Sequence, residues 1–453
     1  MSSREGDGVT CLRQILRRGL ARLRAHTALV QLIGVAVCIL PLLFPTHVPS
    51  WAIPASLVGL VLLLVAGYLL AGRPVARTPV DIPIWLLLLL LPVTILITPD
   101  RNLTLPHVYK VVGSVALFYG IVGAFEEKPW FGLSAFVICT LGVILAILIL
   151  FGTRWTSAKL PWLPFDLYRL FPRLVRPFWN PKGFSSNIAG GTLAMLLPVP
   201  IAYLFCGHRL LVRLGALLEV VVVSLVLLLT QSRGALVALA AGGLVMLVAH
   251  NARSPRLGGV RWLVVTVLLT IAGVLALRFM GADSLLTSDL NTAAGSAVNS
   301  AQGRLELWSR GMMMLQDFPF TGIGFGTVVK VMPLLYPTFV IPNNGEIEHV
   351  HNLYLEAGVD LGFPGLIATL GFLLGLLYLS WRATQRHGGT GLGPLASGTL
   401  GMLVVFAVHG LTDNLTFYPR AHFIAWALFG LAVALGLRPV RDDEPPIANA
   451  PPR

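Results

Sequence analysis

Charged residues are scarce in this chain, and their scarcity excludes an ordinary soluble fold. Asp, Glu, Lys and Arg make up 12% of the 453 residues, about half of the share in soluble domains. Hydrophobic residues make up 56%, and the mean hydropathy is +0.80. The sequence therefore predicts an all-α polytopic membrane protein.

Cysteine is also rare, and its placement argues against a disulfide framework. Of the four cysteines, three lie in apolar runs and one lies in the basic N-terminal tail. No His/Cys cluster has the spacing of a zinc site. The His349-x-His351 pair is a weak metal signal, so we expect no metal. The net charge of +13 does not indicate nucleic acid, because no basic run is interleaved with aromatic residues on a soluble domain.

Long apolar runs predict about 12 transmembrane helices. The first run lacks a small-residue cleavage site, so we interpret it as an uncleaved span. The runs are 27–44, 51–71, 81–98, 106–124, 131–152, 187–206, 211–230, 234–250, 260–280, 353–380, 395–412 and 420–437.

The distribution of Lys and Arg places both termini in the cytoplasm by the positive-inside rule. The chain then begins with a cytoplasmic basic tail (1–26), followed by nine helices (27–280) that include an external basic and aromatic loop at 153–186. A large external loop (281–350) precedes the tenth helix. Three further helices (351–437) and a second cytoplasmic tail (438–453) complete the chain. Within 281–350, the pattern from Arg304 to Phe318 predicts a short amphipathic helix.

His351 and Asn352 stand where this polar loop runs back into an apolar helix. Nine residues later come Gly362-Phe363-Pro364-Gly365, where we expect the helix to break. Histidine can take up and return protons near neutral pH, so His351 is a candidate base at a membrane surface. The alternative is a polar cap on the helix.

Three arginines are candidate partners of His351. Arg233 lies between two apolar spans with no room for a loop, where an ion is costly and often functional, although it could instead snorkel to the interface. Arg304 and Arg310 flank the predicted amphipathic helix, and Glu306 could pair with Arg310 at i,i+4. That pairing would make Arg310 structural. Because guanidinium groups bind phosphate oxygens in bidentate fashion, Arg233 and Arg304 with His351 suggest a diphosphate site beside a base.

Four other ionisable residues lie in or near the spans. Glu356 and Asp360 share one helix face, and we expect them to contact polar groups of the external loop or Arg420. Lys110 and Glu219 could pair within the membrane.

The stretch His351-Asn352, nine residues, Gly362-Phe363-Pro364-Gly365 resembles the H-[NSQ]-x9-G-x-x-[GTY] pattern of bacterial O-antigen ligases. Other features resemble the wider O-antigen ligase/polymerase superfamily. They are Gln231-Ser232-Arg233-Gly234 at the end of a span, Gly303-Arg304 followed by Trp308, the large external loop, and His409-Gly410-Leu411-Thr412-Asp413-Asn414. The pattern does not separate ligases from polymerases.

This resemblance implies a GT-C-like, metal-independent, inverting glycosyltransferase of the bacterial inner membrane that needs no cofactor. The donor would be a glycan on undecaprenyl diphosphate in the membrane lipid. The acceptor would be lipid A–core or another glycan for a ligase, or a second lipid-linked chain for a polymerase. By carry-over, His351 would be the general base. Arg233 and Arg304 would hold the diphosphate, with Asn352 and Arg310 in support.

Other classes remain open at this point. A flippase or transporter would fit twelve spans, but the sequence shows no related halves. A peptidoglycan polymerase of the shape-and-division type also uses a lipid-linked diphosphate, but such enzymes typically rely on an aspartate. A non-catalytic member of the superfamily is a further alternative.

Overall fold

The structure, a computed structural model, describes residues 27–44, 47–49, 51–71, 75–153, 155, 184–207, 209–252, 301–341 and 347–439. The elements assigned in these ranges are all α-helices, as predicted. Residues 1–26, most of the loop at 153–186, the run at 260–280, residues 281–300 and residues 440–453 lie outside these ranges.

Among the described residues, eight helices are long and apolar enough to cross a membrane, and three shorter apolar helices accompany them. The protein is thus a polytopic membrane protein, and these helices account for every predicted span except 260–280. One predicted span, 187–206, is broken into α7 and α8 beside two prolines. The helices are α2 (Thr27–Leu43), α3 (Ala52–Ala71), α4 (Asp81–Ile97), α5 (Arg101–Glu127), α6 (Phe131–Gly152), α7 (Ser186–Leu196), α8 (Pro198–Cys206), α9 (Leu210–Thr230), α10 (Arg233–Asn251), α15 (Leu353–His387), α16 (Gly393–His409) and α17 (Pro419–Leu437).

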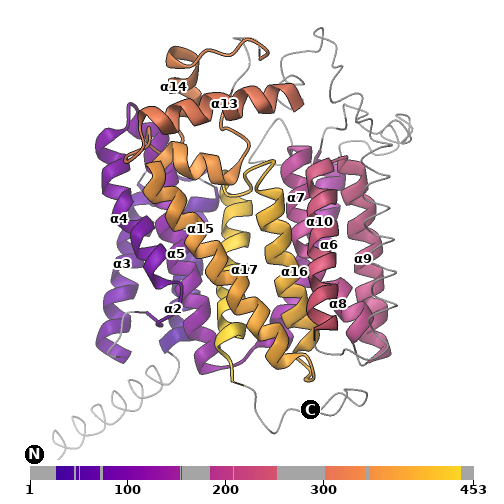
Figure 1. Ribbon diagram of the computed structural model, residues 1–453. Coiled ribbons are helices and arrows are strands. Elements are labelled where there is room, and N and C mark those ends of the chain that lie inside the picture. Colours follow the sequence, from indigo (N-terminus) through magenta and orange to yellow (C-terminus); the bar gives the residue numbers. More distant parts are fainter. Residues whose placement is uncertain are drawn as a thin grey trace, which may run out of the picture.

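Helices α15, α16 and α17 occupy the middle of the bundle (Figure 1). Helix α16 packs against α8 and α10, whereas α17 packs against α5, and α15 contacts α4, α16 and α17. The last three helices therefore join the α2–α5 side of the molecule to the α6–α10 side. This arrangement brings the start of α15 next to the loop between α16 and α17.

Two further helices cover one end of the bundle, which we call the capped end. Helix α13 (Ala301–Asp317) lies across this end, and α14 (Val328–Leu335) lies beyond it (Figure 1). Helix α13 confirms the short helix predicted from Arg304 to Phe318. Its buried Leu307 and Met314 share an apolar cluster with Val350 and Val359. The cap is therefore packed onto the start of α15.

Helix α15 is interrupted at Gly362, where the sequence predicted a break. The φ of Gly362 is 69°, and a Cβ there would lie 2.6 Å from the carbonyl oxygen of Pro319. The preceding loop satisfies the backbone groups freed by the break. Ile323 N–H donates to Val359 O at 2.9 Å, and Phe363 N–H donates to Pro319 O at 2.7 Å. The capped end and the broken helix thus form one hydrogen-bonded unit.

Candidate active site

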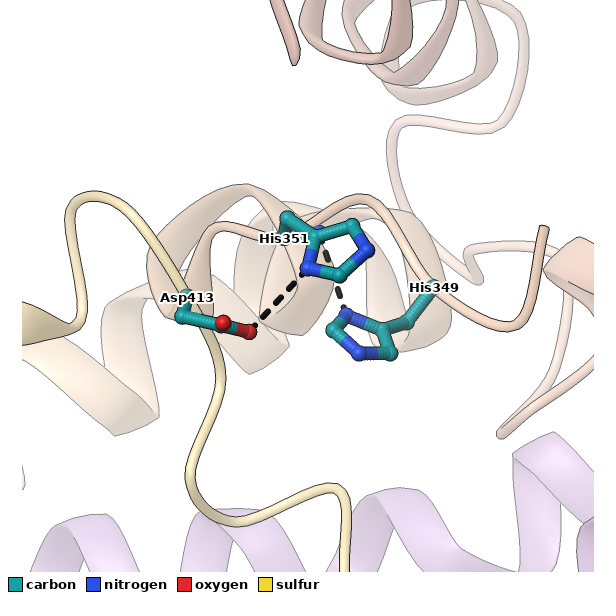
Figure 2. Close-up of side chains that lie close together, drawn as sticks. All are labelled: His349, His351 and Asp413. Carbon is teal, nitrogen blue, oxygen red and sulfur yellow. Dashed lines mark hydrogen bonds and ion pairs between the residues drawn. The ribbon is translucent and has the colours of Figure 1, made fainter. Parts of the chain in front are cut away.

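His351 lies at the capped end, immediately before α15. Its φ is 53°, a left-handed conformation that is uncommon for a residue other than glycine. The side chain keeps 15% of its surface exposed, and Nδ1 lies 3.1 Å from Oδ1 of Asp413 (Figure 2). The loop between α16 and α17 thus supplies a carboxylate to the motif histidine.

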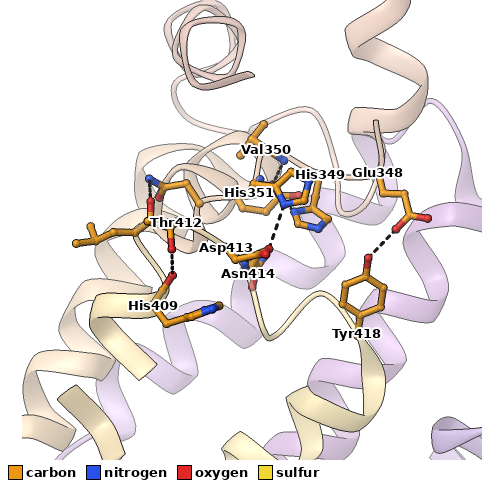
Figure 3. A network of polar contacts seen from close by, with 12 residues as sticks. Glu348, His349, Val350, His351, His409, Thr412, Asp413, Asn414 and Tyr418 are labelled. Atoms are coloured by element: carbon orange, nitrogen blue, oxygen red, sulfur yellow. Dashed lines mark hydrogen bonds and ion pairs between the residues drawn. The ribbon is translucent and has the colours of Figure 1, made fainter. Parts of the chain in front are cut away.

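Asp413 is only 2% exposed and is held in place by its own loop (Figure 3). Its N–H donates to His409 O at 3.0 Å, and its Oδ1 accepts the N–H of Asn414 at 2.8 Å. Burial raises the pKa of Asp413, but the hydrogen bond and positive charge of His351 outweigh it, so the pKa lies below its usual range. An ionised carboxylate accepts hydrogen bonds only, so Nδ1 of His351 carries a proton toward it. In the neutral imidazole, Nε2 is then the free proton acceptor.

His349 lies beside His351 but in different surroundings. It is 1% exposed, and its Nδ1 accepts the N–H of His351 at 3.1 Å. The two ring centroids are 4.0 Å apart, and the ring of Phe417 lies 4.5 Å from that of His349. Burial, followed by the charge of His351, lowers the pKa of His349 to about 3. His349 therefore stays neutral near pH 7 and supports the loop.

Among the residues that the structure describes, His349, His351 and Asp413 form a group that could hold a metal ion. Each offers one ligand atom, and these atoms lie within 4.8 Å of one another. Two histidines and a carboxylate form a donor set that suits zinc or iron. In the observed arrangement, however, Nδ1 of His349 bonds the His351 backbone and Nδ1 of His351 faces Asp413. The absence of a metal remains a prediction.

The N-cap of α15 is Asn352. The capping role that the sequence left open for His351 therefore belongs to the side-chain amide of Asn352. Its Oδ1 accepts the N–H groups of Tyr354 and Leu355, each at 3.0 Å, and its Nδ2 donates to Leu411 O at 3.2 Å. Asn352 therefore joins the start of α15 to the loop that carries Asp413. Its support for His351 is structural in this arrangement.

Arg233 begins α10 directly after a sharp turn from α9. Gln231 takes the left-handed conformation, with φ 51°, so the two helices are joined without a loop, as expected from the sequence. A Cβ at Gly234 would lie 2.3 Å from Oγ1 of Thr412. The first turn of α10 therefore lies against the loop that carries Asp413.

Arg304 lies on α13 and faces the same region. Burial lowers its pKa, the Asp413 carboxylate opposes that shift, and the positive charge of Arg233 adds to it. Arg304 is thus an electrostatic neighbour of both residues. The structure therefore brings together Arg233, Arg304 and His351, which the sequence analysis had selected from three separate segments.

Arg310 does not pair with Glu306, and that expectation was wrong. Glu306 instead accepts the backbone N–H groups of residues 339–341, at 2.5, 3.0 and 3.1 Å. Three N–H groups on one carboxylate replace a single exposed ion pair, which would contribute little. The Arg310 guanidinium lies over the ring of Phe339, 5.4 Å from its centroid.

The possible pairing of Lys110 with Glu219 is not formed either. Lys110 donates to Thr416 O at 2.8 Å and to Phe417 O at 2.7 Å, and its Nζ is 3.1 Å from Nδ1 of His107. Glu219 lies on α9, where its carboxylate abuts α6 at Gly142. Lys110 and Glu219 thus contact different segments of the chain. Their positions in the sequence do not show which segments these are.

Glu356 and Asp360 contact the segment predicted to be the external loop, as expected. Glu356 Oε2 accepts the N–H of Val350 at 2.7 Å, and Asp360 Oδ1 accepts the N–H of Gly326 at 3.2 Å. Both line a cavity of about 110 Å³ that Lys110 also borders.

Asp413 is the site residue that the sequence analysis failed to select. The segment from His409 to Asn414 had been noted only for its resemblance. The signal was an aspartate between two apolar spans, because an ion in that position needs a partner. Its partner lies 62 residues away along the chain.

These features define a polytopic membrane protein with a His–Asp pair and two arginines at one end of its helix bundle. Residues 218–370 match the family model described as O-Antigen ligase. This match covers about a third of the chain and supports its likeness to the O-antigen ligase/polymerase superfamily. The matched segment contains Arg233, Arg304 and His351, whereas Asp413 lies beyond it. A search of curated proteins found no match to the chain.

Proposed function

We propose that the protein transfers a glycan from undecaprenyl diphosphate to an acceptor hydroxyl at the outer face of the bacterial inner membrane. The family match supports a function of the O-antigen ligase/polymerase type. The observation that carries the finer proposal is the His351–Asp413 pair, with Arg304 in its electrostatic surroundings and the start of α10, which carries Arg233, against the Asp413 loop. Such a site combines a proton acceptor with positive charge that can bind an anion.

In the proposed reaction, Nε2 of His351 accepts the proton of the acceptor hydroxyl. The hydroxyl oxygen attacks the anomeric carbon, and the bond from that carbon to the diphosphate breaks with inversion of configuration. The diphosphate leaves with the electron pair. Arg233 and Arg304 stabilise the charge that develops on it. Asp413 stabilises the protonated imidazole, which then returns its proton to water.

This mechanism requires no metal, because the arginines supply the positive charge and Asp413 orients the base. If His349, His351 and Asp413 instead held an ion, Nδ1 of His351 would have to leave its hydrogen bond with Asp413. The proposal therefore predicts transfer in the presence of a chelator. It also places the capped end on the periplasmic side, where the external loop was predicted.

The test is an assay with purified protein and an undecaprenyl-diphosphate-linked oligosaccharide. One arm supplies lipid A–core as acceptor, and the other supplies only further lipid-linked chains. Release of undecaprenyl diphosphate with glycosylated lipid A–core supports a ligase, whereas elongated lipid-linked chains identify a polymerase. Either product should form about a hundredfold or more slowly with His351→Ala. Movement of intact donor across proteoliposome membranes without cleavage would contradict the proposal and favour a flippase.

A further inference from the structure

Glu356 lies directly beneath the loop that presents His351. It belongs to the first turn of α15 and is 2% exposed. Its Oε2 accepts the N–H of Val350 at 2.7 Å, so the side chain reaches back past the start of its own helix. Val350 is the residue between the two histidines. Glu356 therefore binds the loop at the residue between the two histidines.

The loop needs such support because its backbone is strained. His351 adopts φ 53°, a region that residues with a side chain adopt at a cost and only where their surroundings enforce it. The N–H of His351 is held by His349, and the side chain of Val350 is fully buried. The hydrogen bond from the Val350 N–H to Glu356 fixes the other peptide group of this segment, which joins His349 to Val350. Without it, the loop can relax and turn the imidazole away from Asp413.

The second oxygen of Glu356 shows that this hydrogen bond is the main contact of the carboxyl group. Within the described part of the chain, Oε1 has no hydrogen-bond partner, and it borders the cavity shared with Lys110 and Asp360. Asp360 lies one turn further along α15 and accepts from Gly326, in a different loop. The same helix and the same cavity thus contain a matched control for Glu356.

We propose that Glu356 is a positioning residue for His351. By holding the Val350 N–H, its carboxyl group keeps Nδ1 of His351 on Asp413 and leaves Nε2 free. The kinetic part of this inference rests on the proposed function, in which His351 is the base. The geometric part does not depend on any activity.

The geometric part is tested by nuclear magnetic resonance of the full-length protein in detergent, with ¹⁵N-labelled histidine. The proton between His351 and Asp413 is assigned by its loss in His351→Ala. It should be lost or displaced in Glu356→Ala. It should persist in Glu356→Gln, whose amide oxygen accepts the same N–H, and in Asp360→Asn. If Glu356→Ala does not fold, Glu356→Asp serves instead, because its shorter side chain cannot reach Val350. An unchanged resonance in a folded Ala or Asp variant would overturn the proposal.

The kinetic part is tested with the transfer assay. Glu356→Ala should lower kcat about a hundredfold, as misplaced catalytic groups do, while the KM for the lipid-linked donor stays unchanged. Glu356→Gln should recover most of the rate. In the His351→Ala background, Glu356→Ala should cause no further loss, because residues that act as a unit are not additive. An equal loss in both backgrounds would overturn the positioning role. If the native protein transfers nothing, the proposed function fails, and the resonance still decides the role of Glu356.

Discussion

Two groups of ionisable residues meet at the start of α15, and they satisfy their charges differently. The His351 site comprises His351, Asp413, Arg233 and Arg304. The Lys110 cluster comprises Lys110, Glu356 and Asp360. Lys110 is 6% exposed and donates to two backbone carbonyls, so protein groups satisfy it. In the His351 site, by contrast, the two arginines repel each other and the imidazole remains partly exposed.

This difference shows how to interpret ions among apolar helices. Such residues are functional candidates by default, yet Lys110 holds together residues 416 and 417 of the loop that carries Asp413. Its hydrogen bonds identify it as structural. Arg304 instead lies within the electrostatic influence of Arg233, and an anion bound beside them would offset that repulsion. The groups to which a buried ion donates its hydrogen bonds therefore distinguish a structural residue from a functional one better than its burial does.

Replacing the base should have the largest effect. His351→Ala should reduce transfer about a hundredfold or more, because a positioned base contributes about 10²–10⁴-fold in rate. His349→Ala should lose much less activity per folded molecule, because His349 is buried and its pKa, lowered to about 3, makes it a weak base. Steady-state transfer assays on both variants test this. Equal losses would make the two histidines one structural or metal-binding pair.

Arg233→Lys should come next, with transfer reduced by about two orders of magnitude, nearly as much as in Arg233→Ala. An ammonium group cannot reproduce the bidentate contact of a guanidinium with a diphosphate. Arg382→Lys is the matched control, since Arg382 is exposed on α15 and lies over Tyr378. Donor titrations compare the variants. A fully active lysine at position 233 would show that Arg233 only snorkels.

Asp413→Asn should lower transfer by about tenfold or more, because the carboxylate holds the tautomer of His351 and stabilises its protonated form. Steady-state transfer assays compare the variant with the native protein. Asp317→Asn, on the exposed face of α13, is the control. A transfer rate equal to the native one would exclude Asp413 as the partner of the base.

The same substitution should also destabilise the protein in a pH-dependent way. The folded protein holds the pKa of Asp413 below its usual range, so its ionised form contributes stability above the unfolded value of about 4. That contribution is lost only as the pH falls through the lower, folded value. Thermal unfolding should therefore show the deficit of Asp413→Asn at pH 7 and still at pH 5.

Lys110→Met should act on stability, because two buried carbonyl groups lose their donor. We expect a loss of about 1–3 kcal/mol in the free energy of unfolding, measured by thermal unfolding in detergent. Lys330→Met is the control, since the ammonium of Lys330 is exposed and bonded to Asp100. A stable Lys110→Met protein with no activity would move Lys110 into the His351 site.

Metal removal should have the smallest effect. Transfer should continue in excess chelator, because the arginines supply the positive charge that a metal would bring. Complete loss, restored by a single divalent ion, would identify His349, His351 and Asp413 as its ligands.

The sequence predicted the spans well because lipid requires long apolar runs and leaves few alternatives. The break at Gly362 was predictable for a similar local reason, since a glycine and a proline lie together in an apolar run. The pairing of His351 with Asp413 was not, because no local rule joins residues from two separate loops. Glu306 shows the same limit: helical spacing favoured Arg310, but backbone N–H groups more than 30 residues away were better partners.

The break at Gly362 also gives the spacing of the histidine motif a mechanical meaning. One end of the nine-residue segment is fixed at Asn352, which caps the helix, and the other at Gly362, whose neighbour Phe363 donates to Pro319 O. The segment works as a rod of set length between two anchors. One inserted residue would rotate one anchor by about 100° relative to the other and lengthen the rod by about 1.5 Å. At those of the nine positions that make no contact with the loop, a substitution should therefore be tolerated better than a single insertion.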